Sequence, residues 1–435
     1  MASKHSPPRR KERKGGAENF ELGHYPRRVL IAVVTSGLCV WGIWQAARIG
    51  IARQSTRNAT ISDLASVDRA VRLSPHDPET HFVRGDLLQR TENYAEAKIE
   101  LERAVQLRPR DYFLWLVLGL TRDSDRDQEG ALLALRQSAL LAPAYAKPSW
   151  QLGNLLLRMG EIDQAFVELR KAAQRDPTTL PVTIDLAWNL SQHDPKKVAV
   201  MLQPDDDATR LALALFLAKH NQSAAAVEQF LLTKTNSGEK VQTLLQELLK
   251  ARAFGDAYQV WARMHGTPTN AGVEFFDGGF EGSLATGQVG FGWQIAPNIA
   301  NVEMSVDTSE RQSGGRSLHA VFRGNSNPAA PLLTQLILVK PQTHYQITFA
   351  ALTRDFVSAA VPMLTVSDAS DPKGVMLVQS PPLLSDKSGW RLFTVEVTTN
   401  AATQAITISI ARQNCADPCP AFGSLWLDSF SIQSR

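Results

Sequence analysis

The chain has 435 residues, enough for two or three domains of about 150 residues each. Its formal charge is only +3 and 44% of its residues are hydrophobic, which excludes a wholly disordered chain. Three cysteines exclude a disulfide-dense miniprotein and a cysteine-rich zinc fold. Residues 1–28 hold eight basic and three acidic residues, so the remaining 407 sum to about −2, and we expect no nucleic-acid partner.

Residues 29–47 form an uncharged run of 19 residues directly after the basic tail. As a helix this run spans about 28 Å, close to the thickness of the bilayer hydrocarbon core. Trp41 and Trp44 stand near its far end, where indole rings favour the membrane interface.

Because basic residues gather before this run, the positive-inside rule predicts its orientation. We expect a single-pass signal anchor, a transmembrane helix in the inner (cytoplasmic) membrane, with a disordered cytoplasmic tail (1–28) and all later domains outside. A cleaved signal peptide is the alternative. Cleavage at the end of the run would, however, leave Gln45 at the −3 position, where a small residue is needed.

The middle of the chain repeats with a period of 34 residues. Small residues let two antiparallel helices approach closely, leucine fills the space between them, and proline ends the second helix. Five positions keep their residue class through three repeats: Gly85, Gly119 and Gly153; Ala97, Ala131 and Ala165; Leu101, Leu135 and Leu169; Ala104, Ser138 and Ala172; and Pro109, Pro143 and Pro177.

This pattern resembles the tetratricopeptide repeat (TPR). The resemblance implies an all-α TPR solenoid over residues 58–177, opened by a half-repeat at 58–75. After Pro177 the pattern weakens, but the spacing of Ala226 to Phe230 and of Ala257 to Trp261 predicts degenerate helical repeats over 178–266.

An acidic cluster in the second repeat resembles the start of a calcium-binding EF-hand loop, with Asp123, Asp125 and Asp127. Such a loop also needs glycine and glutamate where Gln128 and Ala134 stand. We therefore expect a solvated turn between two helices.

In TPR proteins the first helix of each repeat lines an inner groove. Members that clamp a carboxylate chain end use Lys, Arg and Asn there, whereas this chain has mostly apolar residues. An apolar groove suits the hydrophobic face of a partner helix or an extended apolar peptide; the alternative is that these side chains pack within the array. The partner-groove candidates are Phe82, Phe113, Leu116, Leu120, Trp150, Asn154, Ile184 and Trp188.

The sequence pattern changes near residue 267, where helical periodicity stops and alternating apolar runs begin. Eight to ten such runs, separated by Gly, Pro, Asn and Asp, are typical of a β-sandwich. The clearest runs lie at 317–324, 332–339, 344–352, 391–399, 405–413 and 424–432.

Motifs in this third follow the order of a galactose-binding-like, carbohydrate-binding-module jelly roll: Asp277–Glu281, Gly290–Trp293, Ser313–Leu318 and Trp426–Asp428. The resemblance implies an all-β jelly-roll sandwich over 272–435. Most aromatic residues stand in motif positions that are core in this fold, including Trp293, Trp390, Trp426, Phe349 and Phe393.

The same resemblance suggests ligands for this domain. The candidates for glycan contact are Tyr345, Arg354, Phe356 and Arg412. Members of the fold often hold a structural calcium ion between an opening Glu and a closing Asp, here Glu281 and Asp428, and oxygen ligands suit this cation. No other cofactor is expected.

Cys415 and Cys419 stand in the loop before the last predicted strand. An extracytoplasmic location predicts a local disulfide between them, with free thiols as the alternative. Cys39 lies in the apolar run, where we expect it to pack as a small hydrophobic residue.

The sequence assembles no recognisable catalytic set: nine histidines are scattered, without H-E-x-x-H, G-x-S-x-G or a phosphate loop. We therefore expect no enzyme, although a glycosidase carboxylate pair cannot be recognised without geometry. The leading hypothesis is a non-catalytic cell-envelope scaffold that binds an envelope protein through its TPR groove, in polysaccharide assembly or export. The alternative is a surface glycan-binding protein acting through the jelly roll.

Overall fold

The structure is a computed structural model and describes residues 25–57, 59–268, 273–282, 289–296, 298–384, 389–412, 415–416 and 418–435. The disordered tail predicted for 1–28 lies outside these residues except for its last four. The chain divides into two compact units between Asp176 and Pro177, and each is described by itself.

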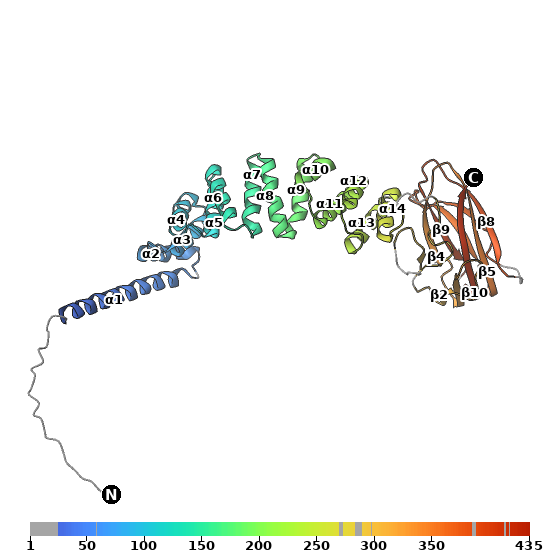
Figure 1. The fold of residues 1–435 in the computed structure, drawn as a ribbon, viewed down its shortest axis with the longest axis horizontal. Helices are drawn as coiled ribbons and strands as arrows, with labels where there is room; N and C mark the ends of the chain where they lie inside the picture. Colours follow the sequence, from blue (N-terminus) through green and yellow to red (C-terminus); the bar gives the residue numbers. More distant parts are fainter. Residues whose placement is uncertain are drawn as a thin grey trace, which may run out of the picture. The chain divides into compact units, whose positions relative to one another are not determined.

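The first unit begins with α1 (Tyr25–Thr56), a single helix of 32 residues (Figure 1). Within the described residues, one helical stretch, Arg28–Thr56, is long and apolar enough to cross a membrane. By its length and composition, this stretch fits either a membrane anchor or a signal sequence near the N-terminus. The helix continues for nine residues beyond Ala47, where the sequence pattern places the end of the membrane segment.

The last turns of α1 pack against the helices that follow. Ala52 and Thr56 are buried, and the Arg48 guanidinium donates two hydrogen bonds to the carbonyl of Leu73, at 2.6 and 3.1 Å, at the end of α2 (Leu64–Leu73). The end of α1 is therefore the first helix of a leading hairpin. The sequence pattern predicts only a half-repeat here, because the partner helix is continuous with the apolar run.

Three regular helical hairpins follow along the chain (Figure 1). In each, the repeated glycine lies against the repeated leucine: a Cβ atom added at Gly85, Gly119 or Gly153 would come within 2.7 to 2.8 Å of a leucine Cγ. The repeated alanines and leucines are buried, as the 34-residue pattern predicts. The hairpins are α3 (Pro78–Arg90) with α4 (Tyr94–Leu107), α5 (Tyr112–Ser124) with α6 (Gln128–Leu141), and α7 (Ala146–Arg158) with α8 (Ile162–Arg175).

The acidic cluster in the second repeat is a helix-connecting turn, as expected. Asp127 caps α6 by accepting a hydrogen bond from the amide of Gly130 at 3.0 Å. Asp125 accepts from Lys98 at 2.6 Å. These acidic side chains are therefore held by helix termini and by a neighbouring basic residue.

The second unit opens with three further, less regular hairpins (Figure 1). Asp206 caps α11 by accepting a hydrogen bond from the amide of Thr209 at 2.8 Å. The helices are α9 (Leu180–Leu190), α10 (Pro195–Leu202), α11 (Asp207–Lys219), α12 (Ser223–Leu231), α13 (Glu239–Lys250) and α14 (Phe254–His265).

The last helix packs on the segment that leads into the β-domain. The Trp261 ring meets the edge of Phe276 and of Phe291, with centroids 4.9 and 5.8 Å apart, and Tyr258 meets Phe291 at 5.0 Å. Gly290 has φ +132, and a side chain there would overlap the Trp261 ring. The change of sequence pattern near 267 is thus a change of secondary structure within one packed unit.

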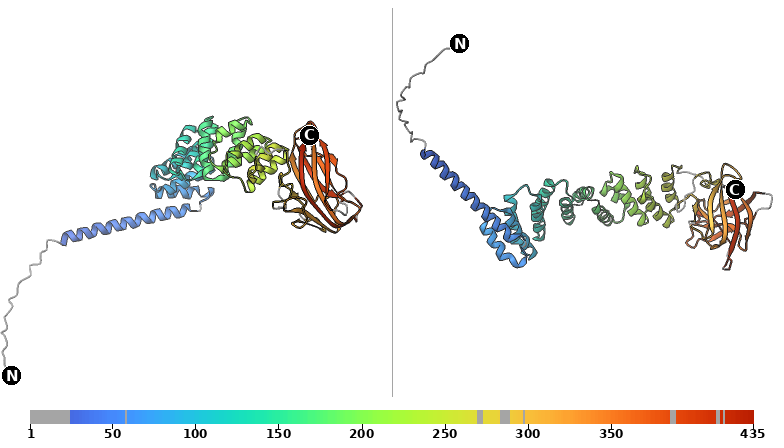
Figure 2. Two further views of the ribbon diagram at one scale, coloured as in Figure 1. Left: turned by 45° about the vertical axis from the view of Figure 1, so that its right-hand side comes forward. Right: turned by 90° about the horizontal axis from the view of Figure 1, so that it is seen from below.

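The β-domain is a sandwich of two five-stranded antiparallel sheets (Figure 2). One sheet has the order β1-β4-β9-β6-β7 and the other β2-β3-β10-β5-β8. The sandwich fold predicted from alternation is confirmed. The strands are β1 (Gln294–Ile295), β2 (Val302–Asp307), β3 (Ser317–Asn325), β4 (Leu333–Leu338), β5 (His344–Ser358), β6 (Pro362–Asp368), β7 (Met376–Gln379), β8 (Arg391–Thr398), β9 (Ala405–Arg412) and β10 (Pro420–Ser434).

Alternate residues of both sheets fill the space between them. On β9, for example, Ile406, Ile408 and Ile410 are all buried in one core cluster. Trp293 and Phe349, expected in the core, belong to it as well.

The tight contact between helices predicts that Gly119→Ala destabilises the array. The new methyl group would lie 2.7 Å from Leu135 Cγ and 3.2 Å from its backbone nitrogen, so the two helices must move apart. We expect the free energy of unfolding to fall by about 1–3 kcal/mol, measured by urea unfolding followed by circular dichroism. Gly255→Ala is the matched control, because nothing lies within 4 Å of its added Cβ. Equal stability of Gly119→Ala and the wild type would contradict this account of the hairpin.

Candidate functional site

The first helices of the three regular hairpins carry partly exposed aromatic residues. Phe113 on α5 is 41% exposed. Its ring meets the edge of Phe82 on α3, with centroids 5.7 Å apart, and Phe82 is half-buried. On α7 the half-buried Trp150 has a carbonyl that accepts a hydrogen bond from Asn154 Nδ2 at 3.0 Å. We call Phe82, Phe113, Leu120, Trp150 and Asn154 the first-helix face.

Leu116 does not belong to this face. It is 1% exposed and lies in a core cluster with Leu135, Leu152 and Leu155. Sequence register assigned it to the same repeat position as Phe82 and Trp150. In this repeat the residue at that position packs between neighbouring hairpins. This agrees with the alternative that the groove candidates pack within the array. Leu120 is half-buried and packs against the same cluster with one side.

Ile184 and Trp188, the remaining groove candidates, lie in the second unit and are also buried, at 2% and 7% exposure. The Trp188 ring is enclosed by aromatic neighbours: His193 at 5.0 Å, Phe216 at 5.8 Å and His220 at 5.3 Å between centroids. Their assignment to an open groove is therefore wrong. The irregular hairpins cover this position with side chains that a repeat register cannot anticipate.

Two of the four glycan candidates are structural residues of the sandwich. Tyr345 is fully buried, and its hydroxyl accepts a hydrogen bond from the Lys340 amide at 2.8 Å. Arg412 is 4% exposed, and burial lowers the pKa of its guanidinium. Neither side chain can contact a sugar, so both assignments are wrong. Whether a strand residue is buried depends on which face of the sheet its side chain occupies. The sequence motif does not determine that face.

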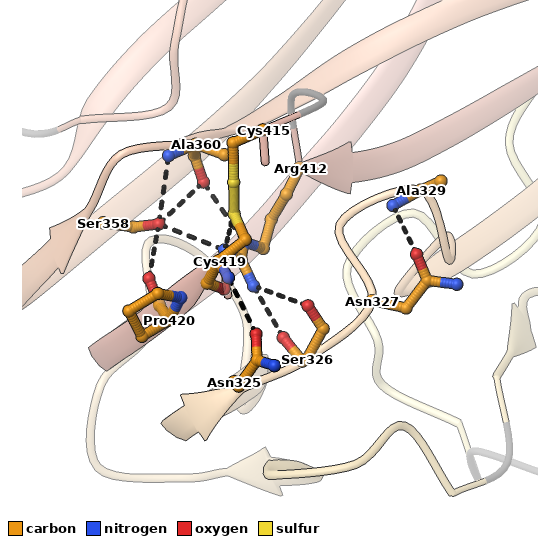
Figure 3. Close-up of a disulfide and its surroundings, with 10 residues drawn as sticks. All are labelled: Asn325, Ser326, Asn327, Ala329, Ser358, Ala360, Arg412, Cys415, Cys419 and Pro420. Atoms are coloured by element: carbon orange, nitrogen blue, oxygen red, sulfur yellow. Dashed lines mark hydrogen bonds between the residues drawn. A yellow bond between two sulfur atoms is a disulfide. The ribbon is translucent and has the colours of Figure 1, made fainter. Parts of the chain in front are cut away.

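Arg412 is instead the centre of a hydrogen-bond network beside the disulfide (Figure 3). Its guanidinium donates to Ser326 Oγ at 2.6 Å, to the carbonyl of Cys419 at 2.6 Å and to the carbonyl of Ala360 at 3.2 Å. Cys419 is joined to Cys415 by a disulfide. The network ties the ends of β5, β9 and β10 together with uncharged acceptors.

The other two glycan candidates do not share a surface. Arg354 lies 5.1 Å from the Trp426 ring and forms a 2.6 Å ion pair with Glu310. Phe356, two residues later on β5, packs against the core cluster and meets the edge of Phe322 at 5.2 Å. Between them Asp355 has φ +53, and this irregularity interrupts the alternation of the strand. Residues that alternation would place on one face are thereby separated.

A family model of the tetratricopeptide repeat matches residues 78–111 and 146–179, which are the hairpins α3–α4 and α7–α8 with the residues that follow them. These segments are tetratricopeptide repeats. The hairpin between them, α5–α6, keeps all five columns of the pattern. No curated protein matches the whole chain or part of it in sequence.

Solved structures of low identity resemble each part of the fold. A crystal structure of MamA is 16% identical, with 44% of this chain and 90% of that chain covered and a TM-score of 0.28. YrrB, described as a TPR protein with an unusual peptide-binding site, is 20% identical, with 36% and 86% covered and a TM-score of 0.31. The CBM22-1 xylan-binding domain of Paenibacillus barcinonensis Xyn10C is 16% identical, with 38% and 96% covered and a TM-score of 0.27.

The two carboxylates expected to hold calcium lie beside one loop of the sandwich. Asp428, fully buried, accepts hydrogen bonds from the amides of Gln312 and Ser313 at 2.8 and 3.0 Å. Glu281 accepts from the amides of Gly315 and Arg316 at 2.6 and 3.2 Å. Within the described part of the chain no group of three or more His, Cys, Asp and Glu side chains gathers at one place. The two carboxylates therefore hold the loop at residues 312–316 through its amides, and the calcium ion stays a prediction.

We therefore expect the sandwich to be stable without calcium. Treating the protein with EDTA should leave its thermal unfolding midpoint unchanged, because loop amides already donate to one oxygen of each carboxylate. Asp428→Asn, in contrast, should lower the midpoint by several degrees, since charge-assisted hydrogen bonds contribute about 1.5–3 kcal/mol. Differential scanning calorimetry measures both effects. A midpoint that falls with EDTA and recovers with added Ca²⁺ would show that an ion displaces these amides.

Proposed function

We propose that this protein is a non-catalytic, membrane-anchored scaffold that binds another envelope protein through the first-helix face of its TPR array. The exposed Phe113 ring beside Phe82 carries the proposal, because a large aromatic side chain at 41% exposure is available to a partner. Leu120, on the same helix as Phe113, adds half-buried apolar surface. Trp150 does the same on α7, the first helix of the next hairpin. TPR proteins bind peptides and proteins, and this chain carries the repeats.

The chemistry of the face favours an apolar partner segment. Phe, Trp and Leu occupy positions where carboxylate-clamp members of the family use charged residues. Aromatic rings supply large contact area with little conformational freedom to lose, so they act as binding anchors. An amphipathic helix or an extended apolar peptide of an envelope protein is the partner that fits.

We infer that α1 stays on the mature protein as a membrane anchor. Its last turns are part of the leading hairpin, with Ala52 buried and Arg53 in a two-pronged ion pair with Asp77 at 2.8 and 2.9 Å. Asp77 is buried and caps α3. Burial alone would raise the pKa of Asp77, but the hydrogen bonds from Arg53 and from the Glu79 amide hold it below its usual value. The apolar run continues without a break into this folded hairpin, which supports an anchor that stays attached.

The basic tail then faces the cytoplasm and both folded units lie outside the inner membrane. Among processes at that site, polysaccharide assembly or export is the context suggested by the carbohydrate-module motifs of the sandwich. Two of the four residues that the glycan-binding alternative needs, Tyr345 and Arg412, are buried. We therefore favour the scaffold.

The scaffold proposal predicts that Phe113→Asp abolishes partner binding while the array stays folded. The side chain is exposed, so the substitution costs little stability, but a charge would stand in the centre of the apolar face. Proteins that co-purify with the intact chain from detergent should be lost or reduced at least about tenfold. Val200→Asp, at a 70% exposed apolar residue of the second unit, is the matched control. Unchanged co-purification with Phe113→Asp would refute the proposed face.

Anchor retention predicts that an epitope placed before Met1 remains on the membrane-bound protein. Protease added to intact spheroplasts should digest the later domains and leave that epitope protected. Arg53→Ala should accelerate digestion of the leading hairpin without releasing the chain from the membrane, because it removes the ion pair to Asp77. Recovery of a soluble chain that lacks the epitope would instead support a cleaved signal peptide.

A further inference from the structure

A stripe of exposed apolar side chains runs over the second helices of the three TPR hairpins. Ile99 on α4, Leu133 on α6 and Val167 on α8 are 62%, 66% and 41% exposed. They are separated by 34 residues each, so they occupy one repeat position. We call these three residues the second-helix stripe. Single exposed apolar residues are ordinary, but the same position in three successive repeats makes a shared surface.

Packing within the array does not use this stripe. Each stripe residue follows a fully buried alanine of its hairpin by two positions, as Leu133 follows Ala131. Two residues turn an α-helix by about 200°, so the stripe points away from the hairpin core. One side-chain hydrogen bond joins two of the second helices, because Arg136 on α6 donates to Gln164 on α8 at 3.0 Å. The stripe therefore lies on the side of the second helices that faces away from their own hairpins.

Charged side chains flank the stripe in a constant order. On each second helix an exposed acidic residue precedes the apolar residue by three or four positions, and an exposed basic residue follows it by three or four. This order also complements the helix dipole. Lys171 has a local partner in Glu168, at 2.6 Å, and its own side chain is 45% exposed. The acid, apolar and basic residues are Glu96, Ile99 and Arg103; Glu129, Leu133 and Arg136; and Asp163, Val167 and Lys171.

We propose that the second-helix stripe is the interface of a homodimer. The order acid, apolar, base becomes complementary to itself when a helix meets an antiparallel copy. A two-fold axis that runs along the row of repeats produces this arrangement for all three helices together. Leu133 then meets Leu133 of the second copy, and Glu129 faces Arg136 of the second copy. No other partner is required to satisfy both the apolar column and the charges.

The same axis agrees with an N-terminal membrane anchor. Because it runs along the repeats, it leaves the α1 helices of both copies at the same end of the dimer. An axis across the repeats would place them at opposite ends, where one membrane could not hold both. Two anchored chains also share a plane, which raises their effective concentration, so an interface of modest area suffices.

Cysteine cross-linking of the full-length protein in lipid nanodiscs tests the axis. In a Cys39→Ser background, Leu133→Cys places two thiols next to each other on the two-fold axis, and mild oxidation should convert most chains to a covalent dimer. Val200→Cys is the control, because that residue is 70% exposed but lies outside the stripe. The proposal is overturned when Leu133→Cys cross-links no better than Val200→Cys.

Charge reversal provides a second, independent measurement by light scattering of the detergent-solubilised chain. Glu129→Arg and Arg136→Glu should each weaken dimerisation by about tenfold, because like charges then face each other across the interface. The double variant should recover the wild-type dimer even though it opposes the helix dipole. All of these side chains are exposed, so circular dichroism should show an unchanged fold. A monomeric wild type, or a double variant no better than the single ones, overturns the proposal.

Discussion

The contact between a glycine of each first helix and a leucine of each second helix is the constraint on which the array depends. At Gly85, Gly119 and Gly153 there is no room for a methyl group, because the leucine side chain of the second helix lies directly against the glycine. The buried alanines beside the leucines complete this contact. Because the inward faces are used in this way, whatever the array offers to other molecules must come from the remaining sides of the helices.

Two surfaces of the array, the first-helix face and the second-helix stripe, differ in chemistry and lie on different helices. The first-helix face presents aromatic rings, with Phe113 the most exposed of them. The second-helix stripe presents aliphatic residues flanked by regularly placed charges. Since the two surfaces lie on separate helices, a partner protein and a second copy of the chain could bind at the same time. The anchor helix would then hold a paired array in a defined orientation at the membrane.

Much of the fold could be predicted because it rests on periodicity. The period of 34 gave the hairpins, alternation gave the strands of the sandwich, and a charge-free run gave the apolar part of α1. The prediction was weaker where one segment serves two purposes. The end of α1 both continues the apolar helix and pairs with α2, and no local pattern marks the change. The α14 helix likewise ends the repeats and packs its Trp261 against Phe276, which ties two differently patterned segments into one unit.

The sequence by itself determined the element types, their order and the spacing of the repeats, because these follow from local propensity and from the period of apolar residues. Only the tertiary structure decided which of the candidate residues are accessible. Leu116 and Trp188 are buried because neighbouring hairpins pack on them. Tyr345 and Arg412 are buried because the two sheets close over them. Phe356 packs against the core cluster because the backbone is irregular at Asp355. Accessibility depends on what packs against a residue from distant parts of the chain, and a pattern along the sequence carries no record of those neighbours.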